Sequence, residues 1–315
     1  MTIAELSERE LVQRIERQLP PRPAWMPIGI GDDAAVVEPA RNRVEVLTVD
    51  ALVEGVHFDR RFTPPDAIGH RALAVNLSDL AAMGAEPRLA LLSFALPPAL
   101  TCDDFDAMVS GLTTLASRHK LHVAGGNLTK SPGPLMLDIT VAGTAKRRQV
   151  LIRGGARPGD EVFVSGTIGA AASALRSLQD GKAPATPRYL YPEPRVRLGL
   201  LLGRNRAASA CVDLSDGLAD GVHQIAAASG VGIEIDESSV PIDATCDMAF
   251  DAAISAGDDY ELLFTASPRL RGRMRAVRRH TDVALTRIGV CTAGGGVRIG
   301  GASPRPVPQG YGHFR

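Results

Sequence analysis

Five short acidic runs divide this sequence, each at the point where a predicted strand ends or a predicted helix begins. They are GIGDDAA (29–35), TVD (48–50), NLSDL (76–80), DLSDG (213–217) and GDDYE (257–261). Asp and Ser are common helix caps, and glycine beside Asp is common in turns, so local structure alone explains any single run. Their number in both halves of the chain favours strand-to-helix units that gather carboxylates.

The pattern along the chain predicts α+β and α/β organisation in two parts. Apolar-polar alternation indicates a strand over 43–50, and a helix follows over 66–84, with Asp66 as its cap and Gly84 as its end. The same criteria predict further elements. Strands are expected at 88–97, 121–126, 134–145, 161–166, 232–236 and 260–265, and helices near the N-terminus and at 102–119, 170–178 and 268–280. The run 211–230 is expected to contain an acidic strand-to-helix turn.

A length of 315 residues favours two domains over one core. The basic stretch 146–160 contains several Gly and Pro residues and is the best boundary, which gives an N-terminal domain over 1–148 and a C-terminal domain over 149–315.

Charge and composition exclude several classes of partner. Lys+Arg and Asp+Glu are equal at 35 each, so no net field draws the chain to nucleic acid or to anionic lipid. The N-terminal segment has no apolar signal core, and no apolar run approaches the length of a membrane span. The four cysteines lie far apart without metal-ligand spacing. We therefore expect a cytoplasmic protein with reduced, mostly buried thiols.

Asp79 is the most informative single residue. Its carboxylate and the amide of Asn76 lie beside an apolar helical stripe made by Ala72, Val75, Leu80 and Met83. A charge buried there needs a counter-ion, and a divalent cation shared among carboxylates meets that need. The alternative is an ion pair of Asp79 with Arg71 or Arg88.

Cationic and glycine-rich segments complement these carboxylates. Arg153 and Lys130 are suited to neutralising phosphate charge, and VAGGNLTKS (123–131) resembles a loop that approaches a ligand, although its spacing differs from the common nucleotide loop. The simpler explanation of 123–131 is a turn between strands. The run GTIGAAASAL (166–175) is better explained by close packing than by a phosphate site. No serine or cysteine nucleophile is indicated, so direct phosphoryl transfer is favoured over a covalent intermediate.

Several motifs together resemble the thiamine-monophosphate kinase family of the aminoimidazole ribonucleotide synthetase and selenophosphate synthetase superfamily. They are GIGDDAAVV, VDALVEGVHF, ALAVNLSDLAAMGAEP, RGGARPGDEVFVSG, VDLSDGLAD, GDDYELLFT and the terminal GYGHF. The resemblance implies an N-terminal α+β domain whose sheet forms a homodimer, a C-terminal α/β domain, and an ATP site lined by acidic turns of both. It implies transfer of the ATP γ-phosphoryl group to thiamine monophosphate, assisted by several Mg²⁺ ions.

The same resemblance assigns residues to roles. The implied metal ligands are Asp33, Thr48, Asp50, Asp79, Asn127, Asp213 and Asp216. The implied ATP contacts are Gly126, Arg153 and Ser215, to which Lys130 is added from its charge. The implied substrate contacts are His57, Glu261 and Phe314.

Two positions depart from the family pattern. Val49 and Asn127 stand where the family has Thr and Asp, and by resemblance both belong to one metal, which we expect to bind more weakly. Two alternatives follow from these departures. The protein is either an ATP-dependent enzyme of the same superfamily with another small substrate, or a nucleotide-binding homologue without catalysis.

Overall fold

The computed structural model describes residues 1–301 and 304–310. The chain packs as two compact units. The first comprises Met1–Leu77 and Pro87–Thr144, and the second comprises Ser78–Glu86 and the described residues from Ala145 onward. The units differ from the contiguous division at 148/149 because the end of one helix and the turn after it pack with the second unit; the domain boundaries themselves stay a prediction.

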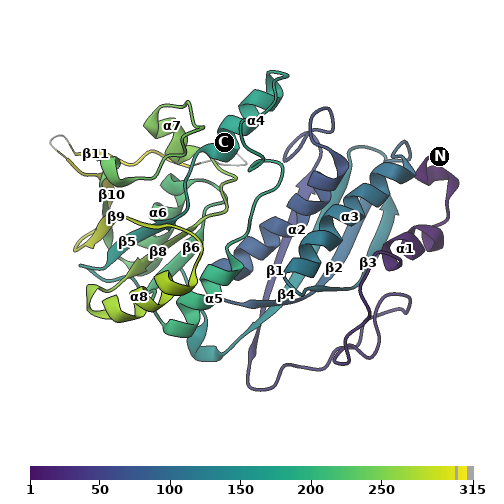
Figure 1. Ribbon diagram of the computed structural model, residues 1–315, viewed down its shortest axis with the longest axis horizontal. Helices are drawn as coiled ribbons and strands as arrows, with labels where there is room; N and C mark the ends of the chain where they lie inside the picture. Colours follow the sequence, from purple (N-terminus) through teal and green to yellow (C-terminus); the bar gives the residue numbers. More distant parts are fainter. Residues whose placement is uncertain (302–303, 311–315) are drawn as a thin grey trace. The chain divides into compact units, whose positions relative to one another are not determined.

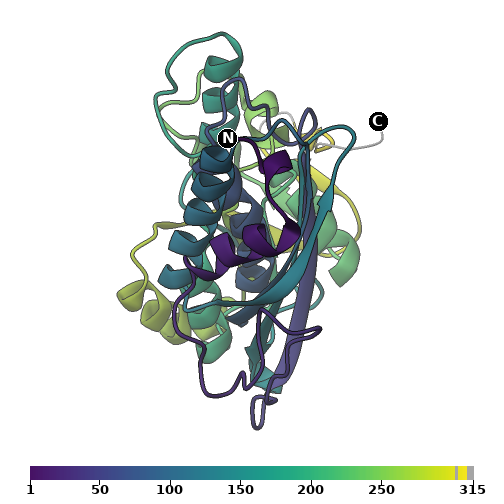
Figure 2. The same ribbon diagram turned by 90° about the vertical axis from the view of Figure 1, so that its right-hand side faces the viewer.

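The first unit is a four-stranded sheet with two long helices on one face (Figures 1 and 2). The strand order is β1-β4-β2-β3, with bounds Val44–Val53, Met136–Ala145, Glu86–Leu96 and His122–Lys130. The helices are α2 (Pro65–Ala82) and α3 (Cys102–Arg118). The two helices can approach closely because Gly69 and Gly111 have no Cβ. A Cβ at Gly69 would lie 1.8 Å from the Met108 carbonyl oxygen, and one at Gly111 would lie 1.9 Å from the Asp66 carbonyl oxygen.

A short helix, α1 (Glu8–Glu16), packs against α3 and β3. It begins at a capping box in which Ser7 and Glu10 each bond the other's backbone N–H. Its apolar side chains Leu11 and Ile15 are buried. The polar remainder of the helix faces solvent, as expected for an amphipathic surface helix.

The second unit is a seven-stranded mixed sheet in the order β11-β10-β7-β9-β5-β8-β6. Its strands are β5 (Glu161–Ser165), β6 (Ala210–Asp213), β7 (Gly232–Ile235), β8 (Leu262–Ala266), β9 (Leu285–Thr292), β10 (Val297–Ile299) and β11 (Arg305–Pro306). Its helices are α4 (Ala170–Gln179), α5 (Val196–Asn205), α6 (Leu218–Ser229), α7 (Phe250–Ser255) and α8 (Arg271–His280). Single 3₁₀ turns occur at Ile3–Glu5, Arg147–Gln149, Glu237–Ser239 and Pro268–Leu270.

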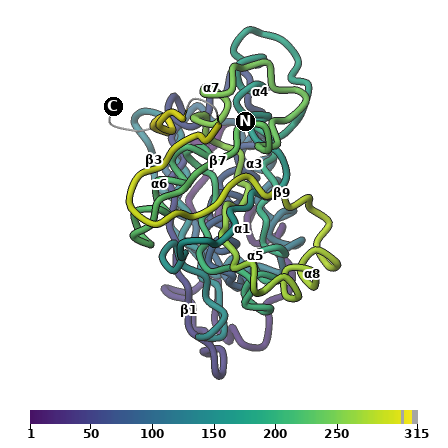
Figure 3. Tube along the Cα trace, turned by 90° about the vertical axis from the view of Figure 1, so that its left-hand side faces the viewer, coloured from purple at the N-terminus to yellow at the C-terminus, as the bar shows by residue number. Residues whose placement is uncertain are grey.

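Both faces of this sheet are covered. Val162 and Val164 belong to the core that α6 completes. Phe163, on the opposite face, stacks on Phe264 with ring centroids 5.4 Å apart, and Arg278 of α8 lies over its ring. Helices α5 and α8 lie side by side (Figures 1 and 3). Burial on both faces explains why β5, β6 and β8 are almost continuously apolar.

Most predicted elements form, with three corrections. Asp66 lies in the first turn of α2 rather than at its cap, because the helix begins at Pro65. Segment 123–131 is not a turn: all of it but Ser131 belongs to β3. Two helices, α5 and α7, were not predicted, since two internal glycines weaken the helical signal of α5 and α7 has only six residues.

The cysteines and the helix lengths agree with the sequence. All four thiols are unpaired, and Cys102, Cys211 and Cys291 are buried. Among the residues that the structure describes, no helix combines the length and apolar content that a membrane span requires.

Candidate functional site

Two of the acidic runs lie side by side in the second unit. Leu214 N–H donates to the Glu261 carbonyl, Tyr260 N–H to the Leu214 carbonyl, and Asp258 N–H to the Ser215 carbonyl, at 2.8–3.0 Å. DLSDG follows β6, and GDDYE precedes β8, which is its antiparallel neighbour. The sheet therefore brings together two segments that are 40 residues apart in sequence.

Glycines allow this close approach. A Cβ at Gly257 would lie 2.3 Å from the Ser215 carbonyl oxygen, and one at Gly217 would lie 2.6 Å from that of Ala256. The GDDYE run also holds two residues with positive φ, Asp258 at 69° and Tyr260 at 50°. Left-handed backbone at a bulky aromatic residue is uncommon and concentrates at functional sites.

Asp213 is the buried carboxylate of this site. Its Oδ2 accepts a hydrogen bond of 2.7 Å from Ser78 Oγ, at the end of α2 that packs with this unit. Burial raises the pKa of Asp213 to about 7, and the negative charge of Asp79 adds to the rise, while Ser78 and Arg153 act in the opposite direction. Two carboxylates that disfavour each other's charge are suited to a shared divalent cation.

The neighbouring predicted residues are more accessible. Asp216 is half-buried and accepts from Ser215 Oγ, which is itself exposed, at 3.2 Å. Arg153 is exposed and lies in the segment before β5, where the Ile152 carbonyl accepts from Cys211 N–H. The alternative counter-ion Arg88 is engaged elsewhere, by the Glu38 carbonyl, the Glu45 carboxylate and the Trp25 ring.

Glu261 is fully buried and pairs with two arginines. Arg195 donates to it through Nε and Nη2, Arg188 through Nη2, and Ser165 through Oγ. Burial lowers the pKa of Arg195, but the hydrogen bond and charge of Glu261, together with the charges of Glu193 and Asp282, outweigh it, and the pKa is raised. Nearby Asp259 is also buried; burial raises its pKa to about 7, although its Oδ2 accepts from Gly169 N–H at the start of α4.

In the first unit, strand alternation separates Val49 from its neighbours. Thr48 and Asp50 are half-buried on one face of β1, and Val49 is exposed on the other, where its side chain is 58% accessible. The Val49 side chain therefore faces away from any ligand that Thr48 and Asp50 hold.

Gly126, Asn127 and Lys130 lie in β3, paired in parallel with β2. Gly126 is opposite Leu92, and its missing Cβ would lie 1.9 Å from the Leu92 carbonyl oxygen. A register shift between Ala90 and Leu91 marks a bulge at this point. Tight strand pairing thus requires glycine at position 126, whatever approaches from outside. Asn127 and Lys130 are exposed.

The remaining predicted residues of this unit lie in loops. Asp33 is exposed in the turn closed by the Ile28–Val36 bridge, and its N–H donates to Asp32 Oδ1. His57 lies in the turn after β1, where its Nδ1 accepts from Val53 N–H, so that Nε2 carries the proton. Phe314 lies outside the described residues.

The strand order separates part of the predicted metal set. β1 and β3 are the two edges of the four-stranded sheet, so Asp50 and Asn127 are three strand spacings apart, about 14 Å. Among the described residues, no three His, Cys, Asp or Glu side chains gather at metal-binding distance. The metal ligands and the contacts of ATP and substrate stay predictions.

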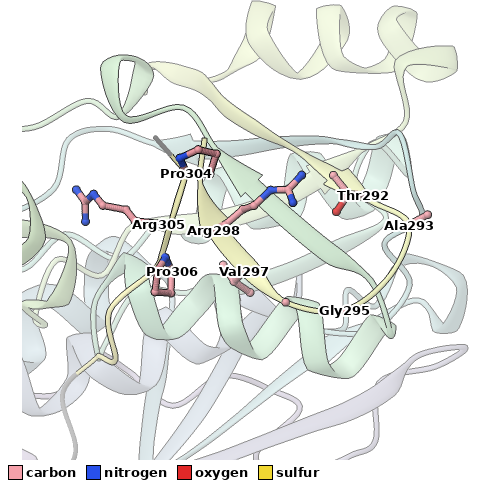
Figure 4. A pocket seen from close by; sticks show the side chains of 9 residues that line it. Thr292, Ala293, Gly295, Val297, Arg298, Pro304, Arg305 and Pro306 are labelled. Atoms are coloured by element: carbon pink, nitrogen blue, oxygen red, sulfur yellow. The ribbon is translucent and has the colours of Figure 1, made fainter. Parts of the chain in front are cut away.

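A shallow cavity of about 310 Å³ in the second unit contains none of the predicted residues. It lies between the β9–β10 turn and β11 (Figure 4). Its two arginines already have partners: Arg298 pairs with Glu234, and Arg305 pairs with Asp251 and Glu237. The cavity therefore lies apart from the acidic turns.

Sequence reasoning missed Ser78, Arg188, Arg195 and Asp259. Ser78 and Asp259 lie inside quoted acidic runs, so their position was visible but their hydrogen bonds were not. Arg188 and Arg195 belong to the stretch RYLYPEPR, which no periodic pattern marks. Only the folded chain brings them to Glu261.

Comparison with known proteins first defines a class. Residues 31–145 match the family model "AIR synthase related protein, N-terminal domain", and residues 157–301 match "AIR synthase related protein, C-terminal domain". The two matches cover most of the chain and both compact sheets.

Individual relatives define the family within that class. Thiamine-monophosphate kinase of Bacillus subtilis (strain 168) is 38% identical over 76% of this chain and 78% of its own. The crystal structure of thiamine-monophosphate kinase from Stenotrophomonas maltophilia K279a is 41% identical, with a TM-score of 0.84 over 96% of this chain and 98% of its own. The structure "AaThiL complexed with AMPPCP and TMP" is 32% identical, with a TM-score of 0.77 over 100% and 99%. The chain belongs to the thiamine-monophosphate kinase family.

Proposed function

We propose that this protein transfers the γ-phosphoryl group of ATP directly to thiamine monophosphate, giving thiamine diphosphate. The observation that carries the proposal is the buried Asp213, held by Ser78 beside Asp79 at the point where the DLSDG and GDDYE runs pair. The relatives named above support the substrate, since they are thiamine-monophosphate kinases, and one of them is complexed with AMPPCP and TMP.

The donor set fits Mg²⁺. Asp79 and Asp213 would provide hard carboxylate oxygens to the ion, whose charge would offset the repulsion between them. Asp216, three residues after Asp213 and half-buried, is the third carboxylate that we assign to this set. Bound Mg²⁺ supplies charge neutralisation for the phosphate oxygens of ATP.

The chain's own groups bind and orient. Arg153 is accessible and close enough to Asp213 to affect its pKa, so its guanidinium is placed to bind a phosphate beside the carboxylates. Ser215 is exposed at the same turn and is assigned to the nucleotide. His57, whose ring is held by Val53 N–H in the turn after β1, is assigned to the acceptor. No side chain is required as a covalent nucleophile, because positioning and charge neutralisation suffice for phosphoryl transfer.

We further propose a homodimer formed through the uncovered face of the first sheet. That face exposes Leu47 at 70%, Val49 at 58% and Leu91 at 41%, an apolar group typical of an interface.

A substrate panel tests the function against its alternatives. Purified protein is incubated with ATP, Mg²⁺ and one of several small phosphorylated metabolites, and ADP and products are quantified. ADP release only with thiamine monophosphate, matched by thiamine diphosphate, is the expected result. Release with a different metabolite points to another enzyme of the superfamily, and ATP binding without any turnover points to a non-catalytic homologue.

A further inference from the structure

The carboxylate of Glu261 has no accessible surface, and its acceptor positions are filled. Oε1 accepts from Arg188 Nη2 at 2.8 Å and from Arg195 Nη2, and Oε2 accepts from Arg195 Nε at 2.7 Å and from Ser165 Oγ at 2.5 Å. An ionised carboxylate has about four lone-pair positions. While this network holds, Glu261 has no position left with which to accept a hydrogen bond from a ligand.

The network joins three segments of the second unit. Ser165 ends β5 and also accepts from Leu262 N–H, and Arg188 Nη1 donates to the Thr167 carbonyl and hydroxyl oxygens. Glu261 belongs to the GDDYE run. We name Glu261 with Arg188, Arg195 and Ser165 the arginine clamp.

The backbone is shaped to admit the arginine clamp. Gly166 has φ of +57°, and a Cβ there would lie 2.1 Å from Glu261 Oε1. The buried carboxylate of Glu261 therefore requires glycine at position 166. This contact is one instance of the close packing that the sequence predicted for 166–175.

The clamp fixes an unusually long connection. Sixteen residues between α4 and α5, 180–195, contain no helix or strand, and connections of this length in compact domains are usually functional or disordered. Both arginines lie in the C-terminal half of this connection, and Tyr189 between them is buried. The clamp therefore orders it against the GDDYE run, whose left-handed Asp258 and Tyr260 indicate strain at a functional site.

Stability alone does not explain this construction. A buried ion pair is often no more stabilising than apolar side chains of the same volume, because two charges must be desolvated. Buried charged networks are better suited to fixing one geometry. The GDDYE run pairs with DLSDG, which contains Asp213, so the clamp fixes a segment of the candidate site.

We propose that Arg188 and Arg195 are positioning residues for the acceptor, acting through Glu261 to hold the 180–195 connection and the GDDYE run as one wall of the acceptor site. The inference rests on the proposed function and names residues that the family resemblance did not assign. Glu261 then influences the acceptor through the geometry it fixes.

Conservative substitutions test the clamp. Arg195→Lys keeps the positive charge but loses the two-nitrogen fork, and Arg188→Lys loses the link to Thr167. Each is measured for KM of thiamine monophosphate, KM of ATP, kcat and Tm, with Arg195→Ala and Arg188→Ala beside them. Arg287→Lys, in an exposed ion pair with Glu161, is the matched control.

We expect the lysine variants to raise KM for thiamine monophosphate about tenfold while KM for ATP stays within about twofold, and the alanine variants to raise it further. An unchanged acceptor KM, or an equal rise for ATP, overturns the inference and leaves the proposed function standing. Wild-type protein that never phosphorylates thiamine monophosphate overturns the proposed function and this inference with it. A variant that does not fold is replaced by Ser165→Ala, for which a smaller selective rise in acceptor KM is expected and no rise contradicts the clamp.

Discussion

Ser78 Oγ donates a 2.7 Å hydrogen bond to Asp213 Oδ2, which joins the last turn of α2 to the end of β6. The contact brings residues 78–80 of the acidic run NLSDL together with DLSDG in one compact unit. It also opposes the rise in the pKa of Asp213 that burial and Asp79 cause. Protonation of this carboxyl should therefore compete with metal binding near neutral pH.

The Mg²⁺ requirement should depend on pH through Asp213. Below about pH 7 the carboxyl takes up a proton, so we expect the Mg²⁺ concentration at half-maximal activity to rise by up to about tenfold per pH unit. Ser78→Ala should move this dependence to higher pH because the hydroxyl no longer stabilises the carboxylate. Ser177→Ala, which removes a hydroxyl bonded within α4, is the control. Identical pH profiles for wild type and Ser78→Ala would contradict the assignment.

Asp259 should make the metal-free protein less stable as the pH rises. Its folded-state pKa is about 7 against an ordinary value of 3.8, so between these values the folded chain holds a proton that the unfolded chain has lost. This costs up to about 1.4 kcal/mol of unfolding free energy per pH unit on going from pH 4 to 7. In urea titrations with EDTA, the unfolding free energy of Asp259→Asn relative to wild type should therefore increase from pH 4 to pH 7. Asp180→Asn, at an exposed position, is the control, and its unfolding free energy should show the same pH dependence as that of wild type. A difference between Asp259→Asn and wild type that does not change with pH would refute the prediction.

Gly126 should be essential for the pairing of β2 and β3. In Gly126→Ala the new Cβ would lie 1.9 Å from the Leu92 carbonyl oxygen, and separating the strands should cost about 2–4 kcal/mol of unfolding free energy. Gly133→Ala, with nothing within 4 Å of its Cβ, should change stability by less than about 0.5 kcal/mol. Chemical denaturation of both variants provides the comparison, and equal effects would show that the close approach does not matter.

Restoring a carboxylate at position 127 should strengthen metal binding. Asn127→Asp adds a charged oxygen ligand, so the Mg²⁺ concentration at half-maximal activity should fall severalfold. Thr129→Asp places the same charge two residues along β3 and serves as the control. An unchanged requirement in Asn127→Asp would remove residue 127 from the metal set.

The dimer should depend on the apolar sheet face. Leu47→Glu combined with Leu91→Glu places charges on two exposed positions of that face and should yield a monomer in light scattering coupled to size exclusion. Glu8→Gln, on the exposed side of α1, should leave the mass unchanged; a monomeric wild type would rule out the proposed interface.

The sequence predicted local structure well where periodicity is strong, as in α2, α3 and the buried strands of the second unit. It failed for 123–131, because Gly126, one of the two glycines that resemble a ligand loop, is required by the Leu92 carbonyl of the neighbouring strand. That requirement is a tertiary contact, which no local pattern records.

The candidate site shows the same limit. Asp79 was chosen as a carboxylate beside an apolar helical stripe and Asp213 from an acidic run at a strand end, and the structure places them close enough to interact. The opposite orientation of Val49 follows from strand alternation and could have been deduced from the sequence. The arginine clamp could not, because Arg188 and Arg195 reach Glu261 only through an irregular connection.

The central claim is direct transfer of the ATP γ-phosphoryl group to thiamine monophosphate. Its most direct measurement is a single-turnover reaction with ATP labelled at the γ-phosphate, in which protein and products are separated and the label is located over time. We predict that label appears in the terminal phosphate of thiamine diphosphate as fast as ATP is consumed, with none bound to protein. Label on the protein before product, or ATP consumption without labelled thiamine diphosphate, would contradict it.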